Sequence, residues 1–171
     1  TMNPGTAGGG MLTSVGDYGL FMVGSHVAHD CIVGDNVVLA NNATLAGHVT
    51  VGSFVILGGL SAVHQFVHIG DHAIVGGMTG VEHDVIPYGS VKGNRASLSG
   101  LNIIGLKRRG FSRGQVDELR AAYRMLFDGD GTFQERLVKL LSTNPSSEAV
   151  LEIIKFIKKD STRAICQPKG G

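Results

Sequence analysis

An aliphatic or aromatic residue returns at every sixth position of this chain, from Val15 to Val81, without a miss. The series consists of Val15, Phe21, Val27, Val33, Leu39, Leu45, Val51, Leu57, Val63, Ile69, Val75 and Val81. An α-helix repeats every ~3.6 residues and an ordinary strand every ~2, so neither produces this period. A period of six is typical of a parallel β-helix, in which three short strands form a triangular coil around stacked aliphatic side chains.

The residues around each repeated aliphatic also fit this fold. The next position is often Gly or Ala, because a tight bend there leaves little room for a side chain. A β-sandwich would need turn signals every ~8 to 12 residues and a two-residue alternation. We therefore predict a mainly β protein, a left-handed parallel β-helix with hexapeptide repeats over residues 15–86. Four coils fit, and they begin at Val15, Val33, Val51 and Ile69.

The last third of the chain has a different pattern. The hexads stop in residues 87–105, where Pro and Gly mark a looped exit. Two capping-box signatures follow, at Ser112 and Thr132, each ahead of apolar residues at helical spacing, and a third such stretch comes after them. We predict a β-helix domain with its exit loop at 1–105 and a domain of three short helices at 106–171.

Composition limits the class of protein. The content of hydrophobic residues is 43% and the formal net charge is +1, as in a globular protein. Cys31 and Cys166 are too few for a disulfide scaffold, which favours a reducing compartment. We find no signal-peptide pattern and no apolar run of about 18 residues. We expect a cytoplasmic protein without a membrane span.

Charge is distributed unevenly along the chain. Residues 1–91 contain no Lys or Arg and six acids, whereas all 15 basic residues and eight acids lie from Lys92 onward. The two parts therefore carry about −6 and +7, so a polyanionic partner should meet the second part. No aromatic stacking series or recognised nucleic-acid motif accompanies these charges. We expect no nucleic-acid partner.

Histidines gather on one predicted face of the prism. Hexads 18 residues apart carry His29, His48, His64 and His83, and we predict that these four form a column along one edge. Asp30 follows His29 directly, and a carboxylate can fix the tautomer of an imidazole and support it as a general base. Two chemistries suit such a cluster. One is zinc held by three imidazoles; the other is metal-free proton abstraction from a hydroxyl.

Several runs of the sequence resemble one enzyme family. Residues 25–30, 39–48, 62–66 and 105–113 closely resemble the UDP-N-acetylglucosamine O-acyltransferases of lipid A biosynthesis, and the similarity covers nearly the whole chain. The resemblance implies transfer of an (R)-3-hydroxyacyl group from acyl carrier protein to the 3-hydroxyl of UDP-N-acetylglucosamine. It also implies a homotrimer with its active site between neighbouring chains, and no cofactor or metal.

The resemblance also implies roles for individual residues. His29 falls on the general base, Asp30 on the carboxylate that orients it, and the backbone N–H of Gly47 on the oxyanion donor. Gly77 falls on a position that sets acyl-chain length, where a small residue implies a long chain. The substrate-binding positions fall on His26, His48, His64, Gln65, Asn102, Arg108 and Arg109.

The sequence departs from the family in three ways. The family has further coils before the position of Thr1, with a substrate-binding lysine, so the chain reads as if coils precede it. Arg95 stands where the family often has a histidine, and Ile104 where it often has an acid that contacts the nucleotide. Two other functions remain open at this stage, a zinc enzyme like the γ-class carbonic anhydrases and a non-catalytic trimer.

Overall fold

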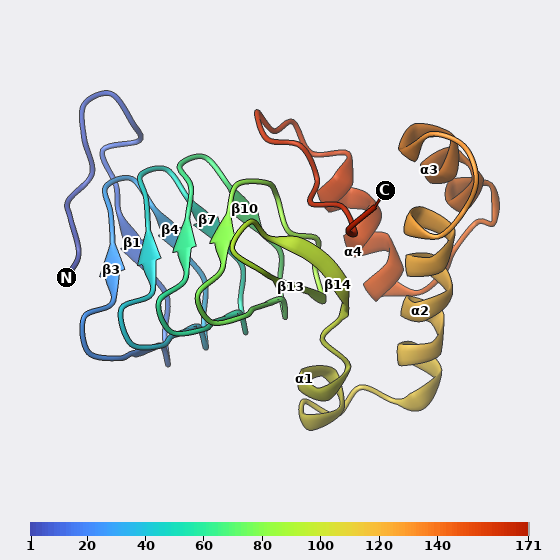
Figure 1. The fold of residues 1–171 in the computed structure, drawn as a ribbon, viewed down its shortest axis with the longest axis horizontal. Coiled ribbons are helices and arrows are strands. Elements are labelled where there is room, and N and C mark those ends of the chain that lie inside the picture. Colours follow the sequence, from blue (N-terminus) through green and yellow to red (C-terminus); the bar gives the residue numbers. More distant parts are fainter. Residues whose placement is uncertain (171) are drawn as a thin grey trace.

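The computed structural model describes residues 1–170 as a prism of short strands followed by helices (Figure 1). The strands of the prism are β1 (Ser14–Val15), β2 (Leu20–Phe21), β3 (His26–Val27), β4 (Ile32–Val33), β5 (Val38–Leu39), β6 (Thr44–Leu45), β7 (Thr50–Val51), β8 (Ile56–Leu57), β9 (Ala62–Val63), β10 (His68–Ile69), β11 (Ile74–Val75) and β12 (Gly80–Val81). Every third strand pairs in parallel, giving the sheets β1-β4-β7-β10, β2-β5-β8-β11 and β3-β6-β9-β12. The predicted parallel β-helix is confirmed.

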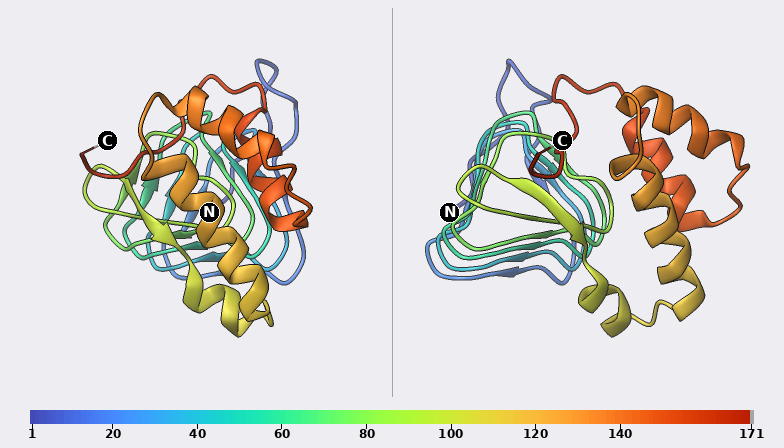
Figure 2. Two further views of the ribbon diagram at one scale, coloured as in Figure 1. Left: turned by 90° about the vertical axis from the view of Figure 1, so that its right-hand side faces the viewer. Right: turned by 45° about the vertical axis from the view of Figure 1, so that its right-hand side comes forward.

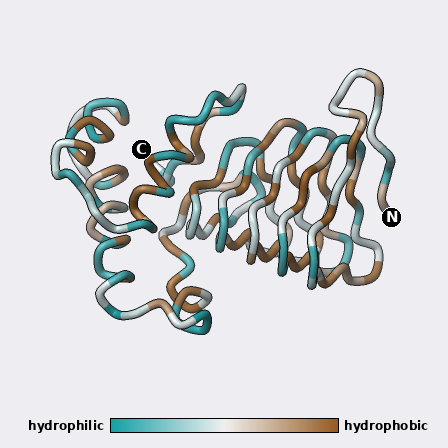
Figure 3. The backbone as a smooth tube through the Cα atoms, turned by 180° about the vertical axis from the view of Figure 1, so that it is seen from behind, coloured by the Kyte–Doolittle hydropathy of each residue, from teal (hydrophilic) through white to brown (hydrophobic). Residues whose placement is uncertain are grey.

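The register between coils is 18 residues throughout, as in the pairs Val27 with Leu45 and Leu45 with Val63. The repeated aliphatic residues therefore stack inside the prism, where Leu39, Leu45 and Leu57 are fully buried. Phe21, in the first coil, remains 37% exposed. Figure 3 shows how apolar and polar residues recur around the coils.

Three columns of turns run along the edges of the prism, and one sheet separates each pair of them. The histidine corner consists of residues 28–31, 46–49, 64–67 and 82–85. The aromatic corner consists of residues 16–19, 34–37, 52–55 and 70–73. The glycine corner consists of residues 22–25, 40–43, 58–61 and 76–79. The right-hand view of Figure 2 shows the triangular outline that these corners give each coil.

The structure gives a more specific reason for the small residue that opens most turns. The bend itself lies two residues later, where φ is positive, as at Leu60 with φ 59°. Gly58 has no positive φ, but a Cβ atom added to it would lie 2.4 Å from the backbone nitrogen of Gly77 in the next coil. The close approach of the next coil therefore excludes a side chain at this position.

The prism ends in two further strands and four helices. β13 (Gly89–Lys92) extends the sheet at β11, and β14 (Ser97–Leu101) pairs with β13 antiparallel. The helices are α1 (Ile103–Arg108), α2 (Arg113–Phe127), α3 (Phe133–Ser142) and α4 (Glu148–Ile157). Both predicted capping boxes are present, at Ser112 and Thr132. The short helix α1 was not predicted; it spans the proposed boundary at residue 105, and the division into two domains stays a prediction.

The helices bury one another beside the end of the prism, with α2 packed against both α3 and α4. After α4 the chain turns back to the prism, where Asp84 and Ile165 form a parallel bridge. No helix within residues 1–170 combines the length and the apolar character needed to cross a lipid bilayer.

Candidate functional site

The first turn of the histidine corner holds His29 and Asp30 together. His29 Nδ1 lies 2.9 Å from Asp30 Oδ2, and the His29 side chain is 42% exposed while that of Asp30 is 2% exposed. An ionised carboxylate only accepts hydrogen bonds, so Nδ1 carries the hydrogen and Nε2 keeps the lone pair. His29 therefore has the tautomer that a general base requires.

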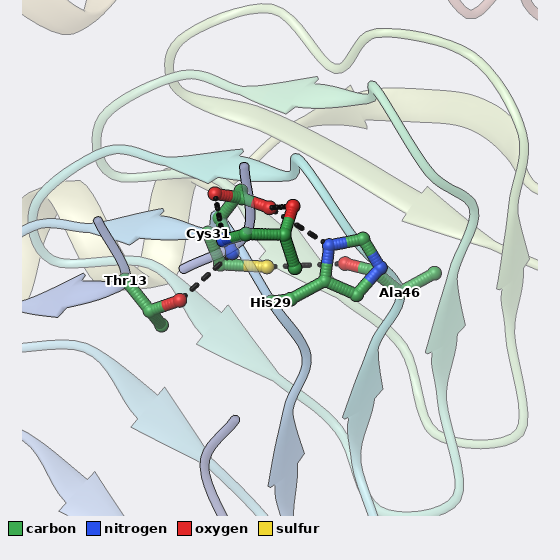
Figure 4. A network of polar contacts seen from close by, with 6 residues as sticks. Thr13, His29, Cys31 and Ala46 are labelled. Atoms are coloured by element: carbon green, nitrogen blue, oxygen red, sulfur yellow. Dashed lines mark hydrogen bonds and ion pairs between the residues drawn. The ribbon is translucent and has the colours of Figure 1, made fainter. Parts of the chain in front are cut away.

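The residues before β1 fix the Asp30 carboxylate. Thr6 donates to it from its backbone nitrogen over 2.9 Å and from its hydroxyl over 2.5 Å, and Asp30 N donates to Thr13 Oγ1 over 2.7 Å. The Thr6 hydroxyl, followed by the Thr6 N–H, lowers the pKa of Asp30 from 3.8 to about 2. Figure 4 shows this network around Thr13 and His29. Asp30 therefore stays ionised at neutral pH.

This lowered pKa makes the stability of the fold depend on pH. The stabilisation that ionised Asp30 gives to the folded state is complete above pH ~4. It is lost as the pH falls toward ~2, because the Asp30 carboxylate binds a proton more readily in the unfolded state. We expect the variant Asp30→Asn to lose less unfolding free energy than the wild type over this window. Urea denaturation at a series of pH values measures it, with Asp130→Asn, an exposed carboxylate, as the control. Equal pH dependence in wild type and Asp30→Asn would contradict the assignment.

Gly47 lies directly beside the His29 ring. A Cβ atom added to Gly47 would lie 2.5 Å from Cε1 and 2.6 Å from Nε2 of His29, so a larger residue would displace the imidazole. Within residues 1–170 the Gly47 N–H donates to no backbone acceptor. This N–H is therefore available to a ligand close to the basic nitrogen.

His48 completes a small cluster at this corner. Its ring meets the His29 ring edge to face at 5.1 Å between centroids and stacks on Phe66 at 4.6 Å. Ligand atoms of His29, Asp30 and His48 all lie within 4.8 Å of one another. This group holds two imidazoles and one carboxylate that Thr6 and His29 already engage. The arrangement does not favour the zinc site of three imidazoles.

A second group of predicted site residues lies at the aromatic corner. Arg109 donates from Nη2 to the carbonyl oxygen of Phe54 over 3.0 Å, its guanidinium lies 5.5 Å from the centre of the Phe54 ring, and Nη1 is buried without a partner within residues 1–170. Asn102 is 5% exposed; its Oδ1 caps α1 and its Nδ2 donates to His72 O over 2.9 Å. Arg108, in the last turn of α1, is exposed.

Comparison with known proteins finds similarity to one family. The family model described as "Udp N-acetylglucosamine O-acyltransferase; Domain 2" matches residues 84–166. The acyl-[acyl-carrier-protein]--UDP-N-acetylglucosamine O-acyltransferase of Caulobacter vibrioides is 59% identical over 169 residues, which are 99% of this chain and 64% of the relative. Over nearly its whole length the chain is similar to UDP-N-acetylglucosamine O-acyltransferases.

Solved structures of O-acyltransferases agree with this similarity. The UDP-N-acetylglucosamine acyltransferase of Campylobacter jejuni matches with a TM-score of 0.90 at 41% identity, over 96% of this chain and 64% of that one. The Arabidopsis UDP-N-acetylglucosamine acyltransferase matches with a TM-score of 0.87 at 42% identity, over 91% of this chain and 57% of that one. The chain thus spans about 64% of the length of the curated relatives it matches.

The four predicted histidines all lie on the histidine corner, but their rings do not form one stacked column. The 18-residue register aligns His29 with Gly47, Gln65 and His83, whereas His48 aligns with Asp30 and Phe66. His64 occupies yet another position of its turn, and its Nδ1 contacts Arg163. Among these four, the described residues 1–170 bring only the rings of His29 and His48 into contact with each other. Counting positions within each hexad would have revealed this, because the four histidines occupy its third, fourth, second and third positions.

The remaining predicted residues occupy other places. His26 lies on β3, and its Nδ1 contacts the hydroxyl of Thr1 at 2.7 Å. Gln65 is exposed on the histidine corner. Gly77 is exposed on the glycine corner, where an added Cβ atom would lie 3.3 Å from Gly59 O. In one chain the predicted site residues are thus divided among β3 with the histidine corner, the glycine corner, and α1 beside the aromatic corner.

Sequence reasoning did not identify Thr6, Thr13 or Arg163. Thr6 and Thr13 lie in a segment without any repeat, and Arg163 lies after the last helix. No spacing pattern relates them to His29 or His64, because their contacts arise only when the two ends of the chain fold back onto the prism.

Proposed function

We propose that this chain carries the active site of an acyltransferase that moves an (R)-3-hydroxyacyl group from acyl carrier protein to the 3-hydroxyl of UDP-N-acetylglucosamine. The observation that carries the proposal is the His29 and Asp30 pair beside Gly47. Relatives that are 59% and 50% identical to this chain are named as acyltransferases that use these two substrates.

The mechanism follows from the tautomer of His29. Nε2 takes the proton of the sugar 3-hydroxyl while the hydroxyl oxygen attacks the thioester carbonyl carbon, and Asp30 stabilises the imidazolium that forms. The tetrahedral intermediate places its negative oxygen at the Gly47 N–H; one such donor contributes about 100-fold or more in rate. When the intermediate collapses, the carbon–sulfur bond breaks and the carrier thiolate receives the proton from His29.

The other predicted residues bind the two substrates. His48 lies against the His29 ring, His26, His64 and Gln65 line the sheet β3-β6-β9-β12 and the histidine corner, and Gly77 borders the path of the acyl chain. Arg108 and Arg109 bind the diphosphate, and Asn102 holds α1 in place for them. The excess of basic residues after Lys92 suits both acidic substrates, which are available in the cytoplasm.

The division of these residues among corners supports a homotrimer. His29 lies at the histidine corner and Arg108 in α1, where the adjacent Arg109 contacts the aromatic corner, and the sheet β1-β4-β7-β10 separates these two corners in one chain. A site that uses both groups forms most simply where the histidine corner of one chain meets the aromatic corner of the next. Repeating this contact around a threefold axis closes the ring.

An acyl-transfer assay tests the function. The protein is incubated with UDP-N-acetylglucosamine and 3-hydroxyacyl carrier proteins of several chain lengths, and the nucleotide is read by mass. We expect product with the mass of the added 3-hydroxyacyl group, and no change when zinc is removed by a chelator. A chain that binds UDP-N-acetylglucosamine but forms no product would contradict the proposal and indicate a non-catalytic trimer.

A further inference from the structure

The segment after α4 returns to the prism and is held there by backbone hydrogen bonds (Figure 1). Asp84 N donates to Ala164 O over 2.8 Å, and Cys166 N donates to Asp84 O over 2.8 Å. Farther along, Leu98 N donates to Gln167 O over 2.9 Å. These bonds fix the path of residues 161–167, which we call the C-terminal strap, along the last turn of the histidine corner.

A buried carboxylate anchors the start of the C-terminal strap. Asp84 is 2% exposed; its Oδ2 accepts from the Ser161 hydroxyl over 2.6 Å and its Oδ1 accepts from His68 N over 2.8 Å. Arg163 N also donates to Ser161 Oγ over 3.1 Å. Arg163 therefore lies between two hydrogen-bonded parts of the C-terminal strap, and this restricts the positions that its side chain can reach.

The side chain of Arg163 contacts two predicted substrate-binding residues. Its Nη2 lies 2.7 Å from His64 Nδ1, and its Nε donates to Gln65 O over 3.1 Å. A guanidinium is always charged and has no acceptor, so it must be the donor and His64 Nδ1 the acceptor. The hydrogen of a neutral His64 then lies on Nε2. The other contact of Nδ1, with Gln65 O at 3.3 Å, is longer and would need the opposite tautomer.

We propose that Arg163 is a positioning residue, which holds the His64 ring with its hydrogen on Nε2 so that His64 donates to an uncharged acceptor oxygen of the substrate. His64 borders a hollow of about 210 Å³, together with Ala62, Gly80 and Arg95. That hollow lies on the same sheet that leads to His29 and suits part of the acyl donor. The proposed contact of His64 with the acyl donor rests on the proposed function, whereas the assignment of the His64 tautomer does not.

The tautomer is measured directly by long-range ¹H–¹⁵N spectra of His64 in protein with labelled histidine, with His64→Gln used for assignment. In the wild type we expect an unprotonated Nδ1 and a protonated Nε2. In Arg163→Met, which keeps the stem but has no donor, we expect both tautomers. Arg163→Lys keeps one donor and should restore the wild-type pattern. Arg120→Ala, which removes an exposed arginine of α2, is the matched control and should change nothing.

Kinetics separate positioning from a purely structural role. Loss of one oriented hydrogen bond in Arg163→Met should raise KM for the acyl donor by about 10-fold with little change in kcat. Unchanged His64 signals in Arg163→Met would overturn the proposal, and so would a loss of stability in that variant without a change of tautomer. If the signals change as expected but the wild type transfers no acyl group, the tautomer assignment stands and the proposed function fails.

Discussion

Replacing His29 by alanine is expected to lower the rate of acyl transfer by about 100-fold or more, because the proposed general base is lost. The fold should persist, since the His29 side chain is 42% exposed and contacts chiefly Asp30 and the His48 ring. Initial rates are read by mass, and the melting temperature is recorded for each variant. The matched control is His83→Ala, an exposed histidine at the same hexad position three coils later, which should keep wild-type activity. Wild-type rates in His29→Ala would refute the assignment.

The variant His29→Ala also tests whether residues of two chains form one active site. Arg108→Ala removes an exposed side chain near the aromatic corner, and we expect homotrimers of either variant to be inactive. If chains mix at random, one site in four joins an intact His29 to an intact Arg108, so an equal mixture should recover about 25% of the wild-type activity. A site formed within one chain would give no recovery at all. The mixture must be refolded together, so that trimers exchange subunits.

Local repetition explains how much of the fold could be predicted. Each hexad contains both its strand and its turn, and the next coil pairs 18 residues later, so the interval from Val15 to Val81 fixes the strands, their register and the stacked core. The capping boxes at Ser112 and Thr132 were equally local and are confirmed. The helix α1 was missed because it is short, begins with two isoleucines and depends on the cap from the buried Asn102.

The site could be predicted only in part, for the same reason. His29 and Asp30 are neighbours in the sequence, and one turn brings their side chains together. The contact of Gly47 with the His29 ring follows from the register, one coil later. The contacts of Thr6 and Arg163 join residues 24 and 99 positions apart and depend on the paths of the two ends of the chain. No periodic pattern encodes such contacts, so only the structure reveals them.

Gly58, which opens one turn of the glycine corner, should be among the most sensitive positions of the prism. A Cβ atom at Gly58 would lie 2.4 Å from Gly77 N, 2.7 Å from Gly76 C and 2.8 Å from Gly77 Cα, all of them backbone atoms. A flexible side chain could rotate away from the added Cβ atom. The backbone cannot, because hydrogen bonds between the strands of neighbouring coils hold it, so the two coils must separate. We expect Gly58→Ala to lower the free energy of unfolding by about 3 kcal/mol, at the upper end of overpacking effects.

Gly114→Ala provides the matched control for this prediction. Gly114 lies in the first turn of α2, where an added Cβ atom would meet nothing closer than Ser112 Oγ at 3.9 Å. Alanine favours a helix over glycine, so this variant should gain up to about 1 kcal/mol. Urea denaturation at one fixed protein concentration measures both changes, because the stability of an oligomer depends on concentration. Equal stability of the two variants would show that the coils can separate at little cost, and that the small residues of the hexad have another cause.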